Sequence, residues 1–474
     1  MDVDNDSIDI QNSLADELQQ RLLELPGRPE EAEKFTIFRV PDHIRQKNKQ
    51  LYEPRMVSIG PYYHGNDAFQ AMEKHKIRYL REYLSRNTGN SINHCISELR
   101  VLESRARRFY FEEVNLQSDE FLKMMLLDGC FIIEFLMKWN SGIPDEMFAV
   151  GWVLPTIRND LLLLENQIPF FIVQKLFSLI SSDPAPSEEN NPRKTLVTML
   201  LEYLSEGKKT EHPFIWVEIK HILHLYHFCY VPSLSANELS TKSFNIKEYL
   251  NPIKLLFVLL PFLRKLSFRR KQISTDERAG RRKPNSINER APRTIQSATE
   301  LQEAGITFKI KISENFLDIK FQNGILEIPF VSIEDTRRSR LLNLVYFEQC
   351  NANLRINLTS YACFMGSLFK TTRDVTLLHE MGIIDNLLAT DQELVTFFTW
   401  LTECSYLDYE AHHLKDLFID VNRYYNSDWH KWRARLKRDY FANPWLTISF
   451  IAACVLLVLA ILQTVYTVLS FYKK

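Results

Sequence analysis

The sequence has little glycine, with 13 residues in 474, whereas about 7% is usual in proteins. This shortage argues against turn-dense β-sandwiches and glycine-rich phosphate loops, and it favours helices. The segment 60–67 (GPYYHGND) has the glycine spacing of a phosphate-binding loop, but Asn66 and Asp67 stand where that loop needs Lys and Ser or Thr. Because the lysine is the main charge partner of the phosphates, we expect a turn with exposed tyrosines here.

No sign of charge dominates either, because 58 Lys and Arg residues nearly balance 59 Asp and Glu residues. A nucleic-acid partner is therefore not expected.

The seven cysteines show no CxxC spacing and no dense clustering, so we expect reduced thiols rather than a disulfide scaffold. No GxGxxG, GxSxG or HExxH motif is present, and no signal peptide is visible. The 45% of hydrophobic residues is enough to bury a sizeable core.

Helical spacing of apolar residues prevails along the chain, so we predict a mainly α fold, a helical bundle. The runs at 121–139 and 160–180 are apolar nearly all round and should lie inside the bundle. Pro169 either opens a second helix or kinks the first, since proline cannot donate the interior hydrogen bond. Further helices are predicted over 212–230 (starting at Pro213), 337–351 and 358–369, and from Thr390, which forms a capping box with Glu393.

The period of the pattern changes from helical to two near 305–330. Four apolar residues alternate with polar ones and predict a half-buried strand: Ile306, Phe308, Ile310 and Ile312. A second strand over 317–322 reaches Asn323-Gly324, which supplies the positive φ angles of a tight turn, and 325–329 returns. We therefore predict a small antiparallel β-hairpin or meander insert near 305–330.

Composition divides the chain into five segments. They are an acidic, disordered leader (1–35), the first part of a helical domain (36–266), a basic flexible linker (267–297), a second part with the β insert and a juxtamembrane basic-aromatic helix (298–440), and a transmembrane helix (444–470). The last assignment rests on a run without charge, of which 445–469 would extend roughly 37 Å as a helix, more than the ~30 Å hydrocarbon core of a bilayer.

The predicted anchor implies a location. More basic residues precede the span than follow it, so we expect a single-pass, tail-anchored membrane protein with the bulk of the chain in the cytoplasm; the extracellular face of the plasma membrane is the alternative. Contact with anionic lipid is predicted for 268–293 and 431–438. The residues expected at the membrane interface are Trp429, Trp432, Arg433, Arg435, Lys437, Arg438 and Trp445.

Three histidines, His221, His224 and His227, are the best metal candidates, but weak ones. They cover one face of a helix, yet the outer two lie about 9 Å apart along its axis. A metal with bonds of about 2.0–2.1 Å cannot take all three from a straight helix. We therefore favour polar positions on a packed helix, and we predict no metal and no cofactor.

Six polar side chains stand deep in apolar company: Asp128, Glu134, Asp160, Glu165, Asn166 and Gln167. Burial raises the pKa of a carboxyl group and suits general acid–base catalysis. Alternatively, these side chains cap helix ends or bind free backbone groups near the break at Pro169. The sequence leaves both alternatives open and identifies no catalytic residue.

Several ordered segments resemble a plant family known as domain of unknown function 247, or uncharacterised protein family 0481. They include VPDHIRQKNKQLYEPRMVSIGPYYHG (40–65), MMLLDGCFIIEFL (124–136), DLLLLENQIPFFIVQKLF (160–177), LLNLVYFEQC (341–350), DVTLLHEMGII (374–384) and DYFANPWLTISFIAA (439–453). The resemblance implies a helical soluble part followed by one C-terminal transmembrane helix. Some grass members are linked to pollen–stigma self-incompatibility, which implies recognition. The family has no established catalytic residues to carry over.

Two hypotheses of function follow. The first is a membrane-anchored protein-recognition or scaffold module that binds another protein, and it is favoured because no catalytic motif is present. The alternative is a membrane-bound hydrolase or transferase that uses the buried carboxylates or the histidine-rich helix. Whether the chain is an enzyme stays open, with the balance against it.

Overall fold

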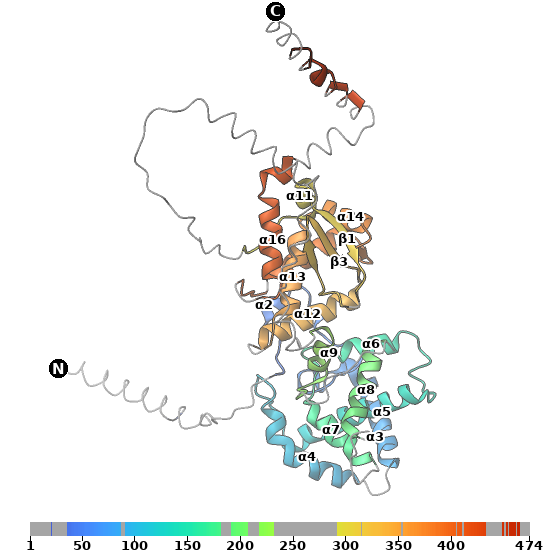
Figure 1. Cartoon of the computed structure of the whole chain (residues 1–474). Helices are drawn as coiled ribbons and strands as arrows, with labels where there is room; N and C mark the ends of the chain where they lie inside the picture. The colour runs from blue at the N-terminus through green and yellow to red at the C-terminus, as the bar shows by residue number, and fades with distance from the viewer. Residues whose placement is uncertain are drawn as a thin grey trace, which may run out of the picture. The chain divides into compact units, whose positions relative to one another are not determined.

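The chain is described by a computed structural model (Figure 1). The described residues are 36–86, 91–181, 191–206, 218–231 and 292–432, without 314, 352–353, 404 and 410–411, together with 20, 448–449, 452–453, 455–460 and 462–464. They divide into two compact units that interleave along the sequence. The first comprises Met1–Cys229, Val331–Gly366 and Ile384–Tyr406, and the second comprises Tyr230–Phe330, Ser367–Ile383 and Leu407–Lys474.

The first unit is mainly helical. Its elements are α2 (Asp42–Arg45), η1 (Lys49–Leu51), η2 (Pro61–Tyr63), η3 (Asp67–Phe69), α3 (Gln70–Ser85), α4 (Ile92–Arg107), α5 (Ser118–Ser141), α6 (Val153–Asp160), α7 (Phe170–Ile180), α8 (Pro192–Leu204), α9 (Ile222–Tyr230), β4 (Val331–Ile333), α12 (Asp335–Cys350), most of α13 (Asn357–Leu368), β5 (Ile384–Asn386) and α15 (Asp391–Glu403). Strands β4 and β5 pair in parallel.

Helix α5 is the centre of the first unit. It packs against α3, α4, α7 and α8, and Figure 1 shows these helices side by side. Every residue from Phe121 to Leu136 is buried except Lys123. The prediction that 121–139 lies inside a helical bundle is therefore confirmed, because a helix that is apolar all round needs neighbours on every side.

The run 160–180 does not form one helix. Helix α6 ends at Asp160, an irregular turn follows, and Pro169 precedes the first residue of α7 with a φ of −58°. Of the two alternatives at Pro169, the opening of a second helix is thus confirmed. The helix predicted from Pro213 begins later, at Ile222, and residues 211–217 lie outside the described part. The helices predicted over 337–351 and 358–369 are α12 and α13.

The second unit contains a three-stranded sheet and helices beside it. Its elements are α11 (Ala298–Glu303), β1 (Thr307–Lys311), β2 (Lys320–Gln322), β3 (Ile325–Pro329), α14 (Thr372–Glu380) and α16 (Lys415–Tyr425). Helices α11 and α14 pack together, and α16 packs against β2 (Figure 1). Leu326 and Ile328 of the central strand are fully buried.

The predicted β insert is correct in its hairpin and wrong in its first strand. Asn323 (φ 52°) and Gly324 (φ 79°) turn the chain, and β2 and β3 pair antiparallel. Strand β1, however, pairs with β3 in parallel, giving the order β1-β3-β2. The expected burial of alternate residues also fails towards its end, where Ile310 is 50% exposed and Ile312 fully exposed. Period-two spacing predicts a strand but not which strand it pairs with.

The transmembrane helix predicted over 444–470 is wrong. In the described part of this run, no helix is both long enough and apolar enough to cross a bilayer. A helix that crosses a bilayer needs roughly 20 consecutive apolar residues. Hydropathy reports composition and does not by itself establish a spanning helix. The single-pass, tail-anchored location derived from this helix is overturned with it.

Two other predicted segments lie outside the described residues. They are the acidic leader, apart from residue 20, and most of the basic linker, since 232–291 is not described. The predicted linker ends at residue 297, and Ser297 caps α11 in a capping box with Glu300. The predicted domain boundaries stay a prediction. The five described cysteines are reduced, as predicted: Cys95, Cys130, Cys229, Cys350 and Cys363.

Asp374 connects α14 to α11, and we expect Asp374→Asn to lower the free energy of unfolding by about 1–3 kcal/mol. Its carboxylate accepts hydrogen bonds from the backbone and hydroxyl groups of Thr299 and Thr371. Burial raises the pKa of Asp374, but these bonds outweigh it and hold the pKa below 3.8. The stabilisation should thus be present above pH 3.8 and be lost as the pH falls below it.

Urea unfolding of the Asp374→Asn variant at pH 7 and pH 3 measures both effects. Asp416→Asn, which changes an exposed carboxylate in the first turn of α16, is the control and should alter stability little. Equal losses in the two variants would show that the contact with Thr299 and Thr371 is not what stabilises this unit.

Candidate functional site

Asp160 binds three consecutive backbone N–H groups. Its carboxylate accepts from Arg55 N at 2.9 Å, Met56 N at 2.8 Å and Val57 N at 2.9 Å. These donors belong to residues 40–60, which we call the N-terminal strap. A carboxylate at the end of α6 thus replaces the water that these N–H groups would otherwise bind.

Two further side chains continue this row of acceptors along the strap. Asn166 Oδ1 accepts from Ile59 N at 2.7 Å, and its Nδ2 donates to Val57 O. Asp128 Oδ2 then accepts from Gly60 N at 2.8 Å. The other oxygen of Asp128 lies 2.6 Å from the ammonium group of Lys76, so this buried carboxylate has a counter-charge.

Glu165 connects the beginning of the strap with the same turn. Its Oε1 accepts from Val40 N at 2.8 Å, and its Oε2 accepts from the Tyr63 hydroxyl. The Arg45 guanidinium lies 3.5 Å from Oε2. Burial raises the pKa of Glu165, and the hydrogen bond from Tyr63 opposes that shift.

The side chain of Gln167 forms hydrogen bonds with the backbone of its own turn. Its Nε2 donates to Leu161 O and Leu163 O, both at 2.8 Å, and its Oε1 accepts from Leu223 N in the first turn of α9. Glu134 instead pairs with the half-exposed Arg86. Of the two alternatives left open by the sequence, the hydrogen bonds match the binding of backbone groups near the break at Pro169. The structure places these side chains in the framework of the first unit.

The segment 60–67 also differs from the expected exposed turn. Tyr63 is buried in η2 and donates to Glu165, whereas Tyr62 is half-buried. Gly60 has a φ of +80°, and a Cβ there would lie 2.4 Å from Gln167 O. The glycine therefore allows close approach of two backbone segments rather than contact with a phosphate.

The three candidate metal ligands are buried on α9 and its entry, and each has a separate partner. His221 Nε2 donates to Thr36 O at 3.1 Å, and its Nδ1 accepts from His224 N. His224 Nδ1 accepts from Lys220 N. His227 Nε2 lies 2.9 Å from Glu348 Oε1, which also binds the first turn of α13. No group of three metal-ligating side chains comes together within the described ranges.

Burial also keeps two of these rings neutral. It lowers the pKa of His221 to about 3 and that of His224 to about 2. The aromatic ring of Phe347 lies within 4.9 to 5.6 Å of all three imidazoles, measured between ring centroids. This arrangement matches polar positions on a packed helix, the alternative that the sequence favoured.

Only part of the predicted membrane interface is described. Trp429 and Trp432 are exposed, with ring centroids 5.5 Å apart. The remaining five residues lie outside the described part: Arg433, Arg435, Lys437, Arg438 and Trp445. The membrane-interface role of these seven residues stays a prediction, as do the lipid contacts of 268–293 and 431–438.

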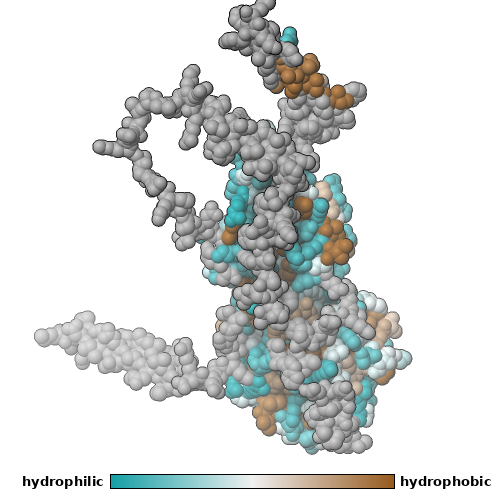
Figure 2. Space-filling view, viewed as in Figure 1, coloured by the Kyte–Doolittle hydropathy of each residue, from teal (hydrophilic) through white to brown (hydrophobic). Residues whose placement is uncertain are grey.

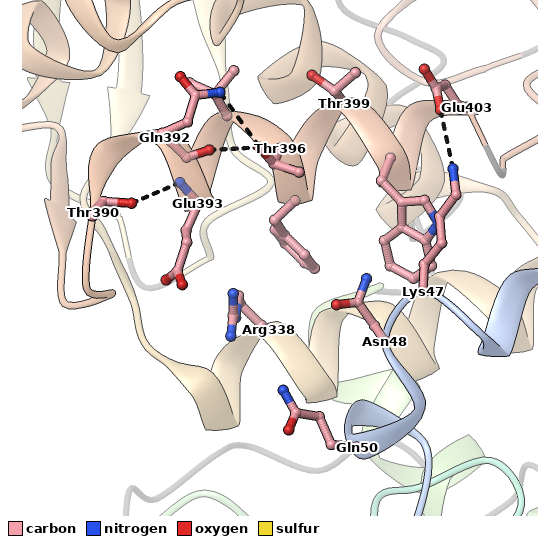
Figure 3. A pocket seen from close by; sticks show the side chains of 13 residues that line it. Lys47, Asn48, Gln50, Arg338, Thr390, Gln392, Glu393, Thr396, Thr399 and Glu403 are labelled. Carbon is pink, nitrogen blue, oxygen red and sulfur yellow. Dashed lines mark hydrogen bonds and ion pairs between the residues drawn. The ribbon is translucent and has the colours of Figure 1, made fainter.

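A surface pocket of about 780 Å³ is the candidate functional site. It lies in the first unit, between the loop around η1, the start of α12 and one face of α15 (Figure 3). Its lining is Lys47, Asn48, Gln50, Arg338, Thr390, Gln392, Glu393, Val395, Thr396, Phe397, Thr399, Trp400 and Glu403. On the face shown in Figure 2, hydrophilic and hydrophobic residues are interspersed over the described surface of this unit.

Buried hydrogen bonds join two walls of the pocket. Leu51 O, at the end of η1, accepts from Ser339 Oγ at 2.8 Å and from Asn343 Nδ2 at 3.0 Å, both on α12. The third wall begins at Thr390, whose Oγ1 accepts from Glu393 N. This bond confirms the helix start predicted there and is drawn in Figure 3.

Charges in the pocket are balanced. Lys47 and Glu403 form an exposed ion pair at 3.9 Å across one end. Arg338 lies across the pocket from Glu393 (Figure 3), with its guanidinium 5.9 Å from the centroid of the Phe397 ring. The arrangement thus offers hydrogen-bonding side chains and an aromatic wall without an excess of either charge.

Sequence reasoning found none of the lining residues apart from the cap at Thr390 and Glu393. They come from three segments of the chain, and no motif joins them. The one signal was the predicted helix from Thr390, which brings Thr396 and Trp400 onto successive turns.

The comparisons give a family without a known activity. The profile of domain of unknown function 247, described as a plant protein of unknown function, matches residues 37–459. A UPF0481 protein of Arabidopsis thaliana is 29% identical over 462 residues, which cover 95% of this chain and 89% of that protein. A putative UPF0481 protein of the same plant is 25% identical over 524 residues, with 98% and 95% covered. No solved structure matches the chain.

Gly60→Ala should lower the free energy of unfolding by about 2–4 kcal/mol, because the new Cβ would meet Gln167 O in a backbone conformation that only glycine adopts readily. Gly65→Ala is the matched control: its φ is +75°, but no atom lies within 4 Å of the new Cβ, so it should lose only about 1–2 kcal/mol. Urea unfolding measures both. Equal losses would contradict the close approach of strap and turn.

His224→Phe should weaken the dependence of stability on pH. In the wild type, the folded pKa of His224 lies far below 6.5, so only the unfolded chain takes up this proton as the pH falls through 6.5. Its contribution to stability is present above pH 6.5 and decreases by about 1.4 kcal/mol between pH 7.5 and 5.5. Phenylalanine keeps the ring packing and cannot titrate.

Urea unfolding at the two pH values checks this prediction. The loss of stability between them should be about 1.4 kcal/mol smaller in His224→Phe than in the wild type. His94→Phe, at an exposed position on α4, should retain the wild-type dependence. If all three proteins lose the same amount, His224 does not titrate differently in the folded and unfolded states.

Proposed function

Because this chain belongs to the plant family domain of unknown function 247, whose activity is not known, we propose its function from the geometry: it is a protein-recognition module. In this proposal the pocket between η1, α12 and α15 binds a segment of another protein. Recognition also agrees with what the family resemblance implies, a part in signalling of the self-incompatibility type.

The observation that carries the proposal is the pocket itself. Buried hydrogen bonds at Leu51 O join the η1 and α12 walls, and Tyr52 packs against Trp400 of the α15 wall, so the site is formed before a partner arrives. Binding to a preformed site loses less conformational entropy than binding to a site that must order. Amides, hydroxyls and two aromatic rings line it, a composition that suits a protein partner.

The alternative, a hydrolase or transferase, has less support. A catalytic carboxylate needs an oxygen that substrate can reach, whereas both oxygens of Asp160 bind backbone N–H groups of the strap. Glu165 is likewise bound at both oxygens, to Val40 and Tyr63, and is fully buried. Neither residue lines the pocket.

Thr396→Trp should reduce the amount of each bound partner protein at least about tenfold, because an indole would fill the pocket. Thr396 is exposed, and its hydroxyl donates to Gln392 O at 2.8 Å. Thr376 on α14 is a matched control: it is also exposed and donates to the carbonyl four residues earlier, Thr372 O. Thr376→Trp should change nothing.

The measurement is affinity capture from plant tissue extract with the full chain, followed by quantitative mass spectrometry of the three proteins in parallel. Melting temperatures of the three should agree. Partners that both the wild type and Thr376→Trp retain, and that Thr396→Trp loses, support the proposal. If Thr396→Trp retains every partner, the pocket is not the recognition site.

A further inference from the structure

Two buried N–H donors of the pocket have no acceptor in the described chain. They are the indole Nε1 of Trp400, a residue only 4% exposed, and the Nε of Arg338. The guanidinium of Arg338 donates to Asp335 Oδ1 through Nη2, not through Nε. An unpaired buried donor is unfavourable, so an occupant that brings an acceptor to this place gains a hydrogen bond that the free protein lacks.

Amide side chains surround these donors. Asn48 and Gln50 lie on one side of the pocket and Gln392 on the other (Figure 3). The side chains of Asn48 and Gln50 make no hydrogen bond within the described residues, and that of Gln392 makes a long one, 3.5 Å, to Thr396 Oγ1. A side-chain amide offers one carbonyl acceptor and N–H donors, the same groups as a peptide bond.

The balance of charge narrows the class of ligand. Lys47 and Arg338 stand against Glu393 and Glu403, so no excess of positive charge favours a phosphate or a nucleic acid. The rings of Phe397 and Trp400 offer an apolar wall beside the donors. A neutral chain that alternates carbonyl groups with side chains fits both features.

We infer that the occupant is an extended peptide segment of a partner protein, with a main-chain carbonyl that accepts from Trp400 Nε1. This inference rests on the proposed recognition function. The segment is extended because a helix uses its carbonyls internally, whereas an extended chain leaves them open. Because Nε1 is shielded in the free protein, a rim side chain moves on binding. Lys47 is 61% exposed and its ion pair is weak, so it is free to do so.

The test uses an array of random-sequence heptapeptides, acetylated and amidated at their ends, with the full-length chain as the probe. The best binder is then synthesised, and its Kd is measured for the wild type, Trp400→Phe and the control Trp152→Phe. Trp152 is 64% exposed and lies outside the pocket. Phenylalanine keeps an aromatic ring in the wall and removes the N–H together with part of the indole ring.

We expect Trp400→Phe to weaken binding by about 3- to 10-fold and to lower the melting temperature, because the smaller ring leaves a cavity at this buried position. A merely structural role of Trp400 would lower the melting temperature and leave the Kd unchanged. Trp152→Phe should leave both unchanged. Undiminished affinity in Trp400→Phe would overturn the inference.

If Trp400→Phe fails to fold, the Arg338→Lys variant is measured in its place and should also bind the peptide more weakly. Its control is Arg337→Lys, one residue away on the exposed side of α12, which should leave the affinity unchanged. Unchanged affinity in Arg338→Lys would then overturn the inference. The inference would also be overturned if the wild-type chain bound an oligosaccharide array and bound no peptide. If no peptide binds but Thr396→Trp loses partner proteins, the inference falls and the recognition function stands, with a folded surface as its partner.

Discussion

The turn between α6 and α7 is buried although its backbone is irregular, and the first unit depends on how this turn is satisfied. Residues 161–169 are all buried, and a buried backbone group without a hydrogen bond is costly. Gln167 supplies donors to the carbonyls of the turn itself, and Asn343 accepts from Leu164 N at 2.9 Å. Each of these polar side chains is placed where a helix or sheet would otherwise provide the bond.

The same turn positions the pocket, although no residue of the turn lines it. Asp160 and Asn166 hold the later half of the strap, and Glu165 holds its beginning. The middle of the strap carries the η1 wall, whose Leu51 O binds Asn343, the residue that also binds Leu164 N. One asparagine on α12 thus joins the turn to the pocket. Tyr52, the next residue of the strap, packs edge-on against Trp400 at 6.5 Å.

The sequence predicts a structural feature correctly where the residues of a single segment determine it. A helix apolar all round, α5, had to be buried, and Asn323-Gly324 had to turn the chain because few other residue pairs tolerate two positive φ angles. It does not predict features that depend on how two distant segments meet. The parallel pairing of β1 with β3 and the gathering of the pocket residues depend on tertiary contacts that no local pattern encodes. The transmembrane helix predicted over 444–470 rested on composition alone, and the described residues contain no helix that could span a bilayer.

Buried carboxylates do not by themselves indicate catalysis. A carboxylate transferred to the interior loses its hydration, and it is stable there only if donors replace the lost water. Backbone N–H groups of a strap that is neither helix nor strand are such donors, and Asp160 uses three of them in succession. The Asp160 carboxylate and the N–H groups of the strap therefore satisfy each other's hydrogen-bonding needs. These bonds fix the position of the strap along the core. Because that position also sets where η1 stands relative to α12 and α15, the polar core keeps formed the pocket on which the proposed recognition function depends.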